Sequence, residues 1–157
     1  VAQVETICVS ASEKTGRPVQ VANDNCPGQV VISGDGLALA EAMALAQGAG
    51  AKKVVQLPIT IAAHSALMTS AAADFAHAVD NTPITTPSIP VIGNVSPEDI
   101  RAELKAQLTA RVRWTETIQY LSGQGVTKVV EVGPGDVLRG LVKRIDRGME
   151  RIGFTLD

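Results

Sequence analysis

Apolar residues recur at helical spacing in the first stretch of the chain. Val1, Val4, Cys8 and Ala11 lie three or four positions apart, so this pattern predicts an amphipathic helix over residues 1–11. A Gly-Arg-Pro sequence follows and ends that helix.

Shorter runs of apolar residues come next. Residues 19–21 and 29–33 predict the two strands of a hairpin, because residues 23–28 between them are mostly turn formers. Residues 37–47 predict an Ala-rich helix that two glycines end. Residues 52–58 predict a third strand.

The resulting order is helix, strand, strand, helix, strand. This is a split β-α-β-β-α-β unit without its first strand. A sheet that lacks a strand leaves an edge unpaired. We therefore expect residues 1–58 to form an incomplete unit of this type, and the chain to begin inside a domain.

Helices and strands also alternate after residue 58. A short linking segment is predicted over residues 59–63. Helices are predicted over residues 65–80, 114–121 and 136–147, and a strand over residues 128–132. One more helix begins with Ser96 as its cap and Pro97 in its first turn. The strand carries three valines among its five residues, and we interpret it as a strand buried on both faces of a parallel sheet. Residues 59–157 are therefore expected to belong to an open α/β sheet.

Composition narrows the classes of function. The chain has 157 residues, of which 45% are hydrophobic and 19% charged, and its formal net charge is -2. The apolar content supports a folded core rather than a disordered chain. The slight acidic excess and the scarcity of aromatic residues argue against a nucleic-acid partner. No apolar run approaches the roughly 18 residues of a membrane span, so no membrane partner is expected either.

Cysteine and histidine are too few for an obvious metal site. Cys8 and Cys26 lie far apart, and the only histidines are His64 and His77. Structural zinc sites use four ligands in spaced pairs, so no metal is expected. We interpret both cysteines as free thiols in a reducing cytoplasm.

His64 is the first candidate for chemistry. It lies among small residues in a loop that leads into a helix, which leaves room for a substrate. Imidazole can exchange a proton near neutral pH and suits a general base, but a histidine that is simply hydrogen-bonded at a helix start fits equally well. The adjacent Ser65 is interpreted as a helix cap. Because the chain has no Gly-x-Ser-x-Gly elbow, a nucleophile for His64 would lie on protein outside it.

Other polar features favour structural interpretations. Gly133-Pro134-Gly135 lacks the spacing of a phosphate-binding loop and predicts a strand-to-helix turn. His77, in the middle of a helix, is interpreted as an ordinary surface or partly buried side chain. A basic stripe recurs every four positions near the C-terminus: Arg139, Lys143, Arg147 and Arg151. Such a stripe is usually a solvated face, and alternatively a surface for an acidic protein or a phosphate group.

A series of short segments carries a pattern found in one enzyme family. The segments are Asn23–Gly34, Leu57–Pro58, Ala63–Met68, Pro90–Val95, Gln107–Leu108, Val112–Trp114 and Glu131–Leu138. Together they resemble the malonyl-CoA:acyl carrier protein transacylases and the related acyltransferase domains of polyketide synthases. Their order and rough spacing fit, and the resemblance covers nearly the whole chain.

That resemblance implies a fold and a reaction. Residues 1–58 would be a ferredoxin-like small subdomain without its first strand, and residues 59–157 the C-terminal part of a large α/β-hydrolase-like core. A serine on a Gly-His-Ser-x-Gly elbow would take the malonyl group from malonyl-CoA and pass it to the phosphopantetheine thiol of acyl carrier protein, for fatty acid biosynthesis. No cofactor is implied, because malonyl-CoA is a substrate and the phosphopantetheine belongs to the carrier protein.

The resemblance also implies roles for single residues. His64 matches the catalytic histidine of the family, and Gln107 matches the position whose carbonyl orients that histidine. Asn23 and Asn25 match a segment that faces the cleft, and would line the substrate channel. The family's serine, its oxyanion partners and the arginine that binds malonate precede position 1. The chain alone is therefore expected to be inactive and to need the missing N-terminal half of the same enzyme.

Three alternatives stay open. Ala63 precedes the histidine where many malonyl-selective relatives have Phe or Ser, so a polyketide acyltransferase with another extender unit is less excluded. The basic stripe would suit a non-catalytic module that docks a carrier protein. The chain could also be a purely structural α/β domain.

Overall fold

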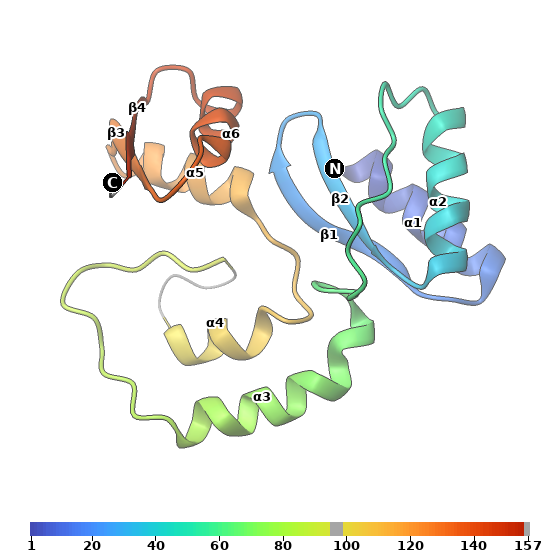
Figure 1. Cartoon of the computed structure of the whole chain (residues 1–157), viewed down its shortest axis with the longest axis horizontal. Helices are drawn as coiled ribbons and strands as arrows, with labels where there is room; N and C mark the ends of the chain where they lie inside the picture. The colour runs from blue at the N-terminus through green and yellow to red at the C-terminus, as the bar shows by residue number, and fades with distance from the viewer. Residues whose placement is uncertain (95–98, 156–157) are drawn as a thin grey trace.

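The computed structural model describes residues 1–94 and 99–155. In chain order its elements are α1 (Ala2–Thr15), β1 (Val19–Cys26), β2 (Gln29–Gly34), α2 (Gly36–Gly48), the 3₁₀ turn η1 (Ala66–Met68), α3 (Thr69–Asn81), α4 (Ile100–Ala106), α5 (Trp114–Gly123), β3 (Lys128–Val132), α6 (Val137–Ile145) and β4 (Glu150–Phe154). They form an α/β protein in three groups, α1–α2 with the first hairpin, the pair α3 and α4, and α5–β4 (Figure 1). In the described part of the chain, no helix has both the length and the apolar character to cross a membrane.

The first group is a two-stranded antiparallel sheet with two helices packed against it. Its core consists of small and β-branched side chains: Cys8, Ala11, Val19, Val21, Ala38 and Ala42. Ala38 and Ala42 on α2 are fully buried, which lets α1 and α2 approach closely. The predicted helices and the hairpin are thereby confirmed, and the helix predicted over residues 1–11 extends to Thr15.

The hairpin turn is shorter than predicted. β1 continues through Asn23–Cys26, and only Pro27 and Gly28 form the turn. The reason is pairing on the second edge of β1, where the Val112 amide donates to the Ala22 carbonyl and the Asp24 amide donates to the Val112 carbonyl, both at 2.8 Å. These bonds outside the local sequence override the turn preference of Asn and Asp.

The prediction of a strand over residues 52–58 is wrong, because this segment forms no strand. Among the described residues this segment joins neither sheet, and Val55 and Leu57 remain 58% and 46% exposed. An apolar strand pattern produces a strand only where a neighbour supplies backbone partners, and β1 already has a partner on each edge.

The last group is a two-stranded parallel sheet of β3 and β4 with α5 and α6 packed on it. β3 has the predicted bounds, whereas β4 was not predicted. The expected burial on both faces of β3 is wrong: Val129 packs against the core of Ile118, Val142 and Met149, but Val130 and Val132 are 51% and 74% exposed. No helix in the described ranges covers that second face.

α3 and α4 pack side by side below these sheets in Figure 1. The Arg101 guanidinium donates to carbonyls at the end of α3, and Lys105 pairs with Asp80. Ser65 begins η1 as expected, with its side chain accepting from the Leu67 amide. Asp99 caps α4, and the cap predicted at Ser96 lies outside the described residues.

The start of α6 depends on one carboxylate from β3. Glu131 accepts hydrogen bonds from the Leu138 amide at 2.9 Å and the Arg139 amide at 3.0 Å, and pairs with the Arg139 guanidinium. The Arg139 amide, with help from the Leu138 amide and the guanidinium, lowers the pKa of Glu131 below its ordinary value of 4.5, although burial opposes this. The stabilisation is therefore present above pH 4.5 and is lost as the pH falls through the folded-state pKa.

We predict that Glu131→Gln lowers the urea midpoint of unfolding at pH 7, because one charged acceptor at the α6 N-terminus is removed. The difference from the wild type should shrink as the pH falls below 4.5. Glu13→Gln, at an exposed position of α1, is the matched control. Equal midpoints for Glu131→Gln and the wild type at pH 7 would contradict this role.

Candidate active site

His64 lies in the loop between α2 and η1, against a segment that we call the connector, residues 107–113 between α4 and α5. The His64 amide donates to the Leu108 carbonyl at 3.0 Å. The imidazole Nδ1 lies 2.9 Å from the Ala110 carbonyl oxygen. Backbone and ring are thus both bonded to the connector.

The bond to Ala110 fixes the chemistry of the ring. A carbonyl oxygen only accepts hydrogen bonds, so Nδ1 must carry a proton. In the neutral imidazole this leaves the lone pair on Nε2, which is the atom then available to take up a proton. The arrangement suits a general base whose ring is oriented by a backbone carbonyl instead of a carboxylate.

The backbone of His64 is strained. Its φ of 58° is the only positive φ of a non-glycine residue in the described ranges. A left-handed conformation costs an L-residue about 1–2 kcal/mol and persists only where surrounding contacts hold it. Such strain clusters at functional sites, which favours the catalytic interpretation of His64 over a simple structural one.

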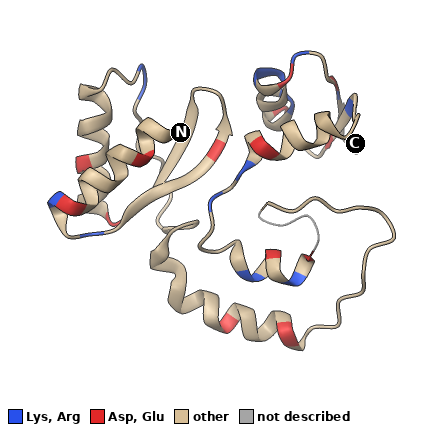
Figure 2. Ribbon diagram, turned by 180° about the vertical axis from the view of Figure 1, so that it is seen from behind, with Lys and Arg blue, Asp and Glu red and all other residues tan. Residues whose placement is uncertain are grey.

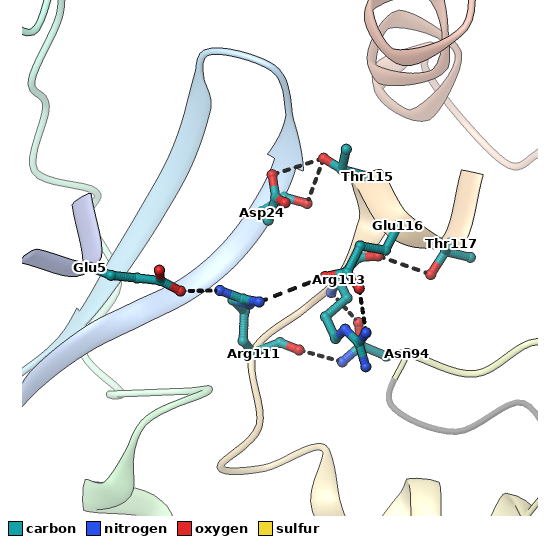
Figure 3. Close-up of polar contacts among 8 residues, drawn as sticks. All are labelled: Glu5, Asp24, Asn94, Arg111, Arg113, Thr115, Glu116 and Thr117. Atoms are coloured by element: carbon teal, nitrogen blue, oxygen red, sulfur yellow. Dashed lines mark hydrogen bonds and ion pairs between the residues drawn. The ribbon is translucent and has the colours of Figure 1, made fainter. Parts of the chain in front are cut away.

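The connector is held on its other side by Asn94 (Figure 3). The Asn94 amide group donates to the Arg111 carbonyl at 2.7 Å, and its side-chain oxygen accepts from the Arg113 amide. The Asn94 backbone amide donates to the buried carboxylate of Glu103 on α4, at 2.7 Å. One carboxamide therefore satisfies two backbone groups of the connector.

Charged side chains tie the connector to the neighbouring elements, as Figure 3 shows. Arg111 pairs with Glu5 of α1 at 2.6 Å and lies 3.7 Å from Glu116 of α5. Arg113 also bonds Glu116, and this hydrogen bond lowers the pKa of the Glu116 carboxyl. Asp24 of β1 accepts a hydrogen bond from the Thr115 hydroxyl at 2.8 Å. The connector thus lies where the three groups meet.

The other residues matched to the family lie near the connector to different degrees. Gln107 ends α4, and its amide donates to the Glu103 carbonyl. The ring of His64 bonds the carbonyl three residues further on, at Ala110. Asn23 forms a parallel bridge with Val112, so β1 runs beside the connector at that point. Asn25 is half-buried further along β1.

Ser65 is buried as the cap of η1. It is 1% exposed, and its hydroxyl donates to the Ala62 carbonyl at 2.7 Å while accepting from the Leu67 amide. Both bonds belong to the cap of η1. The expectation that Ser65 is a helix cap is confirmed.

Two of the four side chains of the basic stripe, those of Arg139 and Arg151, form bonds within the protein. Figure 2 marks the basic positions along the ribbon. Arg139 pairs with Glu131, and Arg151 donates to carbonyls of residues 146, 147 and 149. The neighbouring Arg144 donates to the Pro27 carbonyl at 3.0 Å. These bonds give Arg139 and Arg151 a structural role, whereas Lys143 and Arg147 are exposed.

The Gly-Pro-Gly segment forms a turn and His77 is a surface side chain, both as expected. Gly133 and Gly135 have φ values of 130° and 89° in the turn between β3 and α6. His77 is exposed on α3, where the Asn81 side chain contacts it. Residues 1–94 and 99–155 contain no cluster of three potential metal-binding side chains among His, Cys, Asp and Glu.

Sequence reasoning missed Ala110, Asn94 and Gln20, which bond the segments around His64. Ala110 contributes only a backbone carbonyl, which no sequence pattern marks. Asn94 lies within a segment that carried the family resemblance, and this was the one signal available for it.

Comparison with known proteins gives a consistent result. No family model matches the chain. The chain is 42% identical to malonyl CoA-acyl carrier protein transacylase of Haemophilus influenzae, over 94% of its own length and 49% of that protein. It spans about half the length of the curated relatives that it matches.

Solved structures agree in fold. An acyl carrier protein S-malonyltransferase from Vibrio cholerae superposes with a TM-score of 0.91 at 40% identity, covering 96% of this chain and 51% of that one. A malonyl-transacylase solved in complex with a type II polyketide acyl carrier protein gives a TM-score of 0.90 at 36% identity, covering 99% and 51%.

We predict that the neutral His64 ring carries its proton on Nδ1. The reason is that the Ala110 carbonyl only accepts hydrogen bonds, so it cannot bond an Nδ1 that lacks a proton. Nitrogen-15 spectra of the two histidine rings, recorded at a pH where imidazole is neutral, measure the tautomer directly. Exposed His77 serves as the internal reference. A proton found on Nε2 of His64 would refute the assigned orientation.

We also predict that Asn94→Leu lowers the free energy of unfolding by about 1–3 kcal/mol, because it leaves the Arg111 carbonyl and the Arg113 amide unpaired. Asn94→Asp keeps an acceptor for Arg113 but loses the donor, so an intermediate loss is expected. Urea denaturation measures both. If Asn94→Leu is as stable as the wild type, Asn94 does not hold the connector.

Proposed function

Since the chain is a homologue of the malonyl CoA-acyl carrier protein transacylases over about half of their length, we propose that it forms the part of such an enzyme that contributes the catalytic histidine. The proposed substrates are malonyl-CoA and the phosphopantetheine thiol of an acyl carrier protein. The observation that carries the proposal is the bond from Nδ1 of His64 to the Ala110 carbonyl, which leaves the lone pair of the neutral ring on Nε2.

The proposed chemistry has two half-reactions. A serine outside this chain attacks the thioester carbonyl of malonyl-CoA while Nε2 of His64 takes the serine proton. The tetrahedral intermediate collapses, the bond to sulfur breaks, and the proton passes to the departing coenzyme A thiol. The carrier-protein thiol then gives its proton to Nε2 and attacks the malonyl ester. The second tetrahedral intermediate collapses, the ester bond to the serine oxygen breaks, and His64 returns the proton to that oxygen, which leaves malonate as a thioester on the carrier protein.

Four further residues enter the proposal with lesser roles. Gln107 is proposed as a positioning residue that caps α4 and begins the connector. Asn23 and Asn25 are proposed to line the substrate channel, which is supported by their half-buried places on β1 and by the bridge of Asn23 to the connector. Ala63, half-buried beside His64, leaves room for a substituent on the acyl group.

The same relationship suggests how the chain is divided. We propose that residues 1–58 form a ferredoxin-like small subdomain without its first strand and that residues 59–157 belong to a larger α/β core. Unpaired residues 52–58 and the exposed face of β3 support this, because both lack the layer that would bury them. A cytoplasmic location follows as part of this proposal.

A hybrid enzyme tests the function. Residues 1–157 replace the matching half of the Haemophilus influenzae relative, and the assay follows transfer of labelled malonate from malonyl-CoA to holo-acyl carrier protein. We predict transfer by the hybrid, none by the chain alone, and a loss of roughly 10²–10⁴-fold in kcat for His64→Ala.

His77→Ala is the matched control, since His77 is exposed on α3. It should retain the activity of the hybrid. A folded hybrid whose rate is the same with and without His64 would overturn the proposed role of this residue.

A further inference from the structure

Gln20 forms three hydrogen bonds around His64 that the chemistry above does not use. Its Nε2 donates to the His64 carbonyl at 3.1 Å and to the Thr109 carbonyl at 3.3 Å. Its Oε1 accepts from the Ala66 amide at 3.1 Å. Only this orientation of the carboxamide satisfies both carbonyls and the amide, because carbonyls need a donor and the amide needs an acceptor.

The strand that carries Gln20 is a rigid support. Gln20 lies opposite Ser33 in the β1–β2 ladder. Its neighbours Val19 and Val21 are buried in the core under α1 and α2. The side chain therefore extends from a fixed backbone toward the turns at His64 and Thr109 and toward the first residue of η1, Ala66.

Gln20 bonds both segments that form the hydrogen bond between the His64 ring and the Ala110 carbonyl. His64 carries the imidazole, and Thr109 immediately precedes Ala110, whose carbonyl accepts from that imidazole. The Gln20 side chain thus holds His64, the donor residue, next to the segment that carries the acceptor carbonyl of Ala110. It also bonds the carbonyl of the residue whose left-handed φ needs outside support.

We propose that Gln20 is a positioning residue for His64, which holds the loop and the connector in register so that Nδ1 stays on Ala110 and Nε2 stays free. The importance of this arrangement for catalysis rests on the proposed function. The arrangement of the loop and the connector does not. Gln20 touches no reacting atom in this proposal and acts only through His64.

Two substitutions separate the bonds. Gln20→Met is uncharged and of similar length, and removes all three hydrogen bonds. Gln20→Glu keeps the acceptor for the Ala66 amide and removes the donor to His64 and Thr109. Gln47→Met and Gln47→Glu make the same chemical changes at an exposed position of α2 and serve as controls.

The readout is the tautomer of His64 in the intact chain, from ring nitrogen-15 shifts at a pH where the imidazole is neutral. A purely structural role, in which Gln20 only adds stability, leaves the tautomer unchanged. We expect both Gln20 variants to shift His64 from the Nδ1-protonated form to a mixture of tautomers, because the ring loses its fixed acceptor. His77 should not change, and neither should His64 in the Gln47 variants.

An unchanged His64 tautomer in folded Gln20→Glu would overturn the proposal. Circular dichroism establishes folding for each variant, and Gln20→Glu keeps the proposal falsifiable if Gln20→Met does not fold. No acyl transfer is measured, so an inactive hybrid enzyme would count against the proposed function and leave this result standing. In an active hybrid, Gln20→Glu should lower kcat and leave KM for malonyl-CoA nearly unchanged.

Discussion

The backbone of the connector carries polar groups that must be satisfied where three parts of the protein meet, and the site depends on how this is done. The carbonyls of Leu108, Thr109 and Ala110 accept from His64 and Gln20. The groups of residues 111–113 bond Asn94 and β1 instead. Unmade hydrogen bonds in such a place are costly, so these contacts hold residues 108–113 of the connector in one conformation.

This arrangement explains which features the sequence predicts well. Helices α1, α2 and α5 and the strand Lys128–Val132 follow from periodicity, because each buries an apolar stripe against a neighbour. His64 was recognised from its small neighbours and its family match. Asn23–Cys26 and residues 52–58 were predicted wrongly for one shared reason, namely that strand formation depends on partners distant in sequence. Ala110 acts through its backbone carbonyl, and the Gln20 side chain bonds only backbone groups of other residues, so neither contact leaves a residue pattern to detect.

The exposed apolar surfaces fit the same account. Val130 and Val132 on β3, like Val55 and Leu57 in the unpaired segment, have the residue types of buried strands without the burial. The curated relatives are about twice as long as this chain. Within the described residues, His64 is hydrogen-bonded to Leu108, Gln20 and Ala110. The proposed general base is thus oriented by groups of this chain, while the proposed nucleophile comes from outside it.

The most direct test of this division is a crystal structure of the hybrid enzyme, with one distance as the result. We predict that Nδ1 of His64 still bonds the Ala110 carbonyl and that Nε2 lies within about 2.6–3.2 Å of the nucleophilic serine hydroxyl. A ring turned so that Nε2 bonds Ala110, or a serine bonded to another base, would contradict the account.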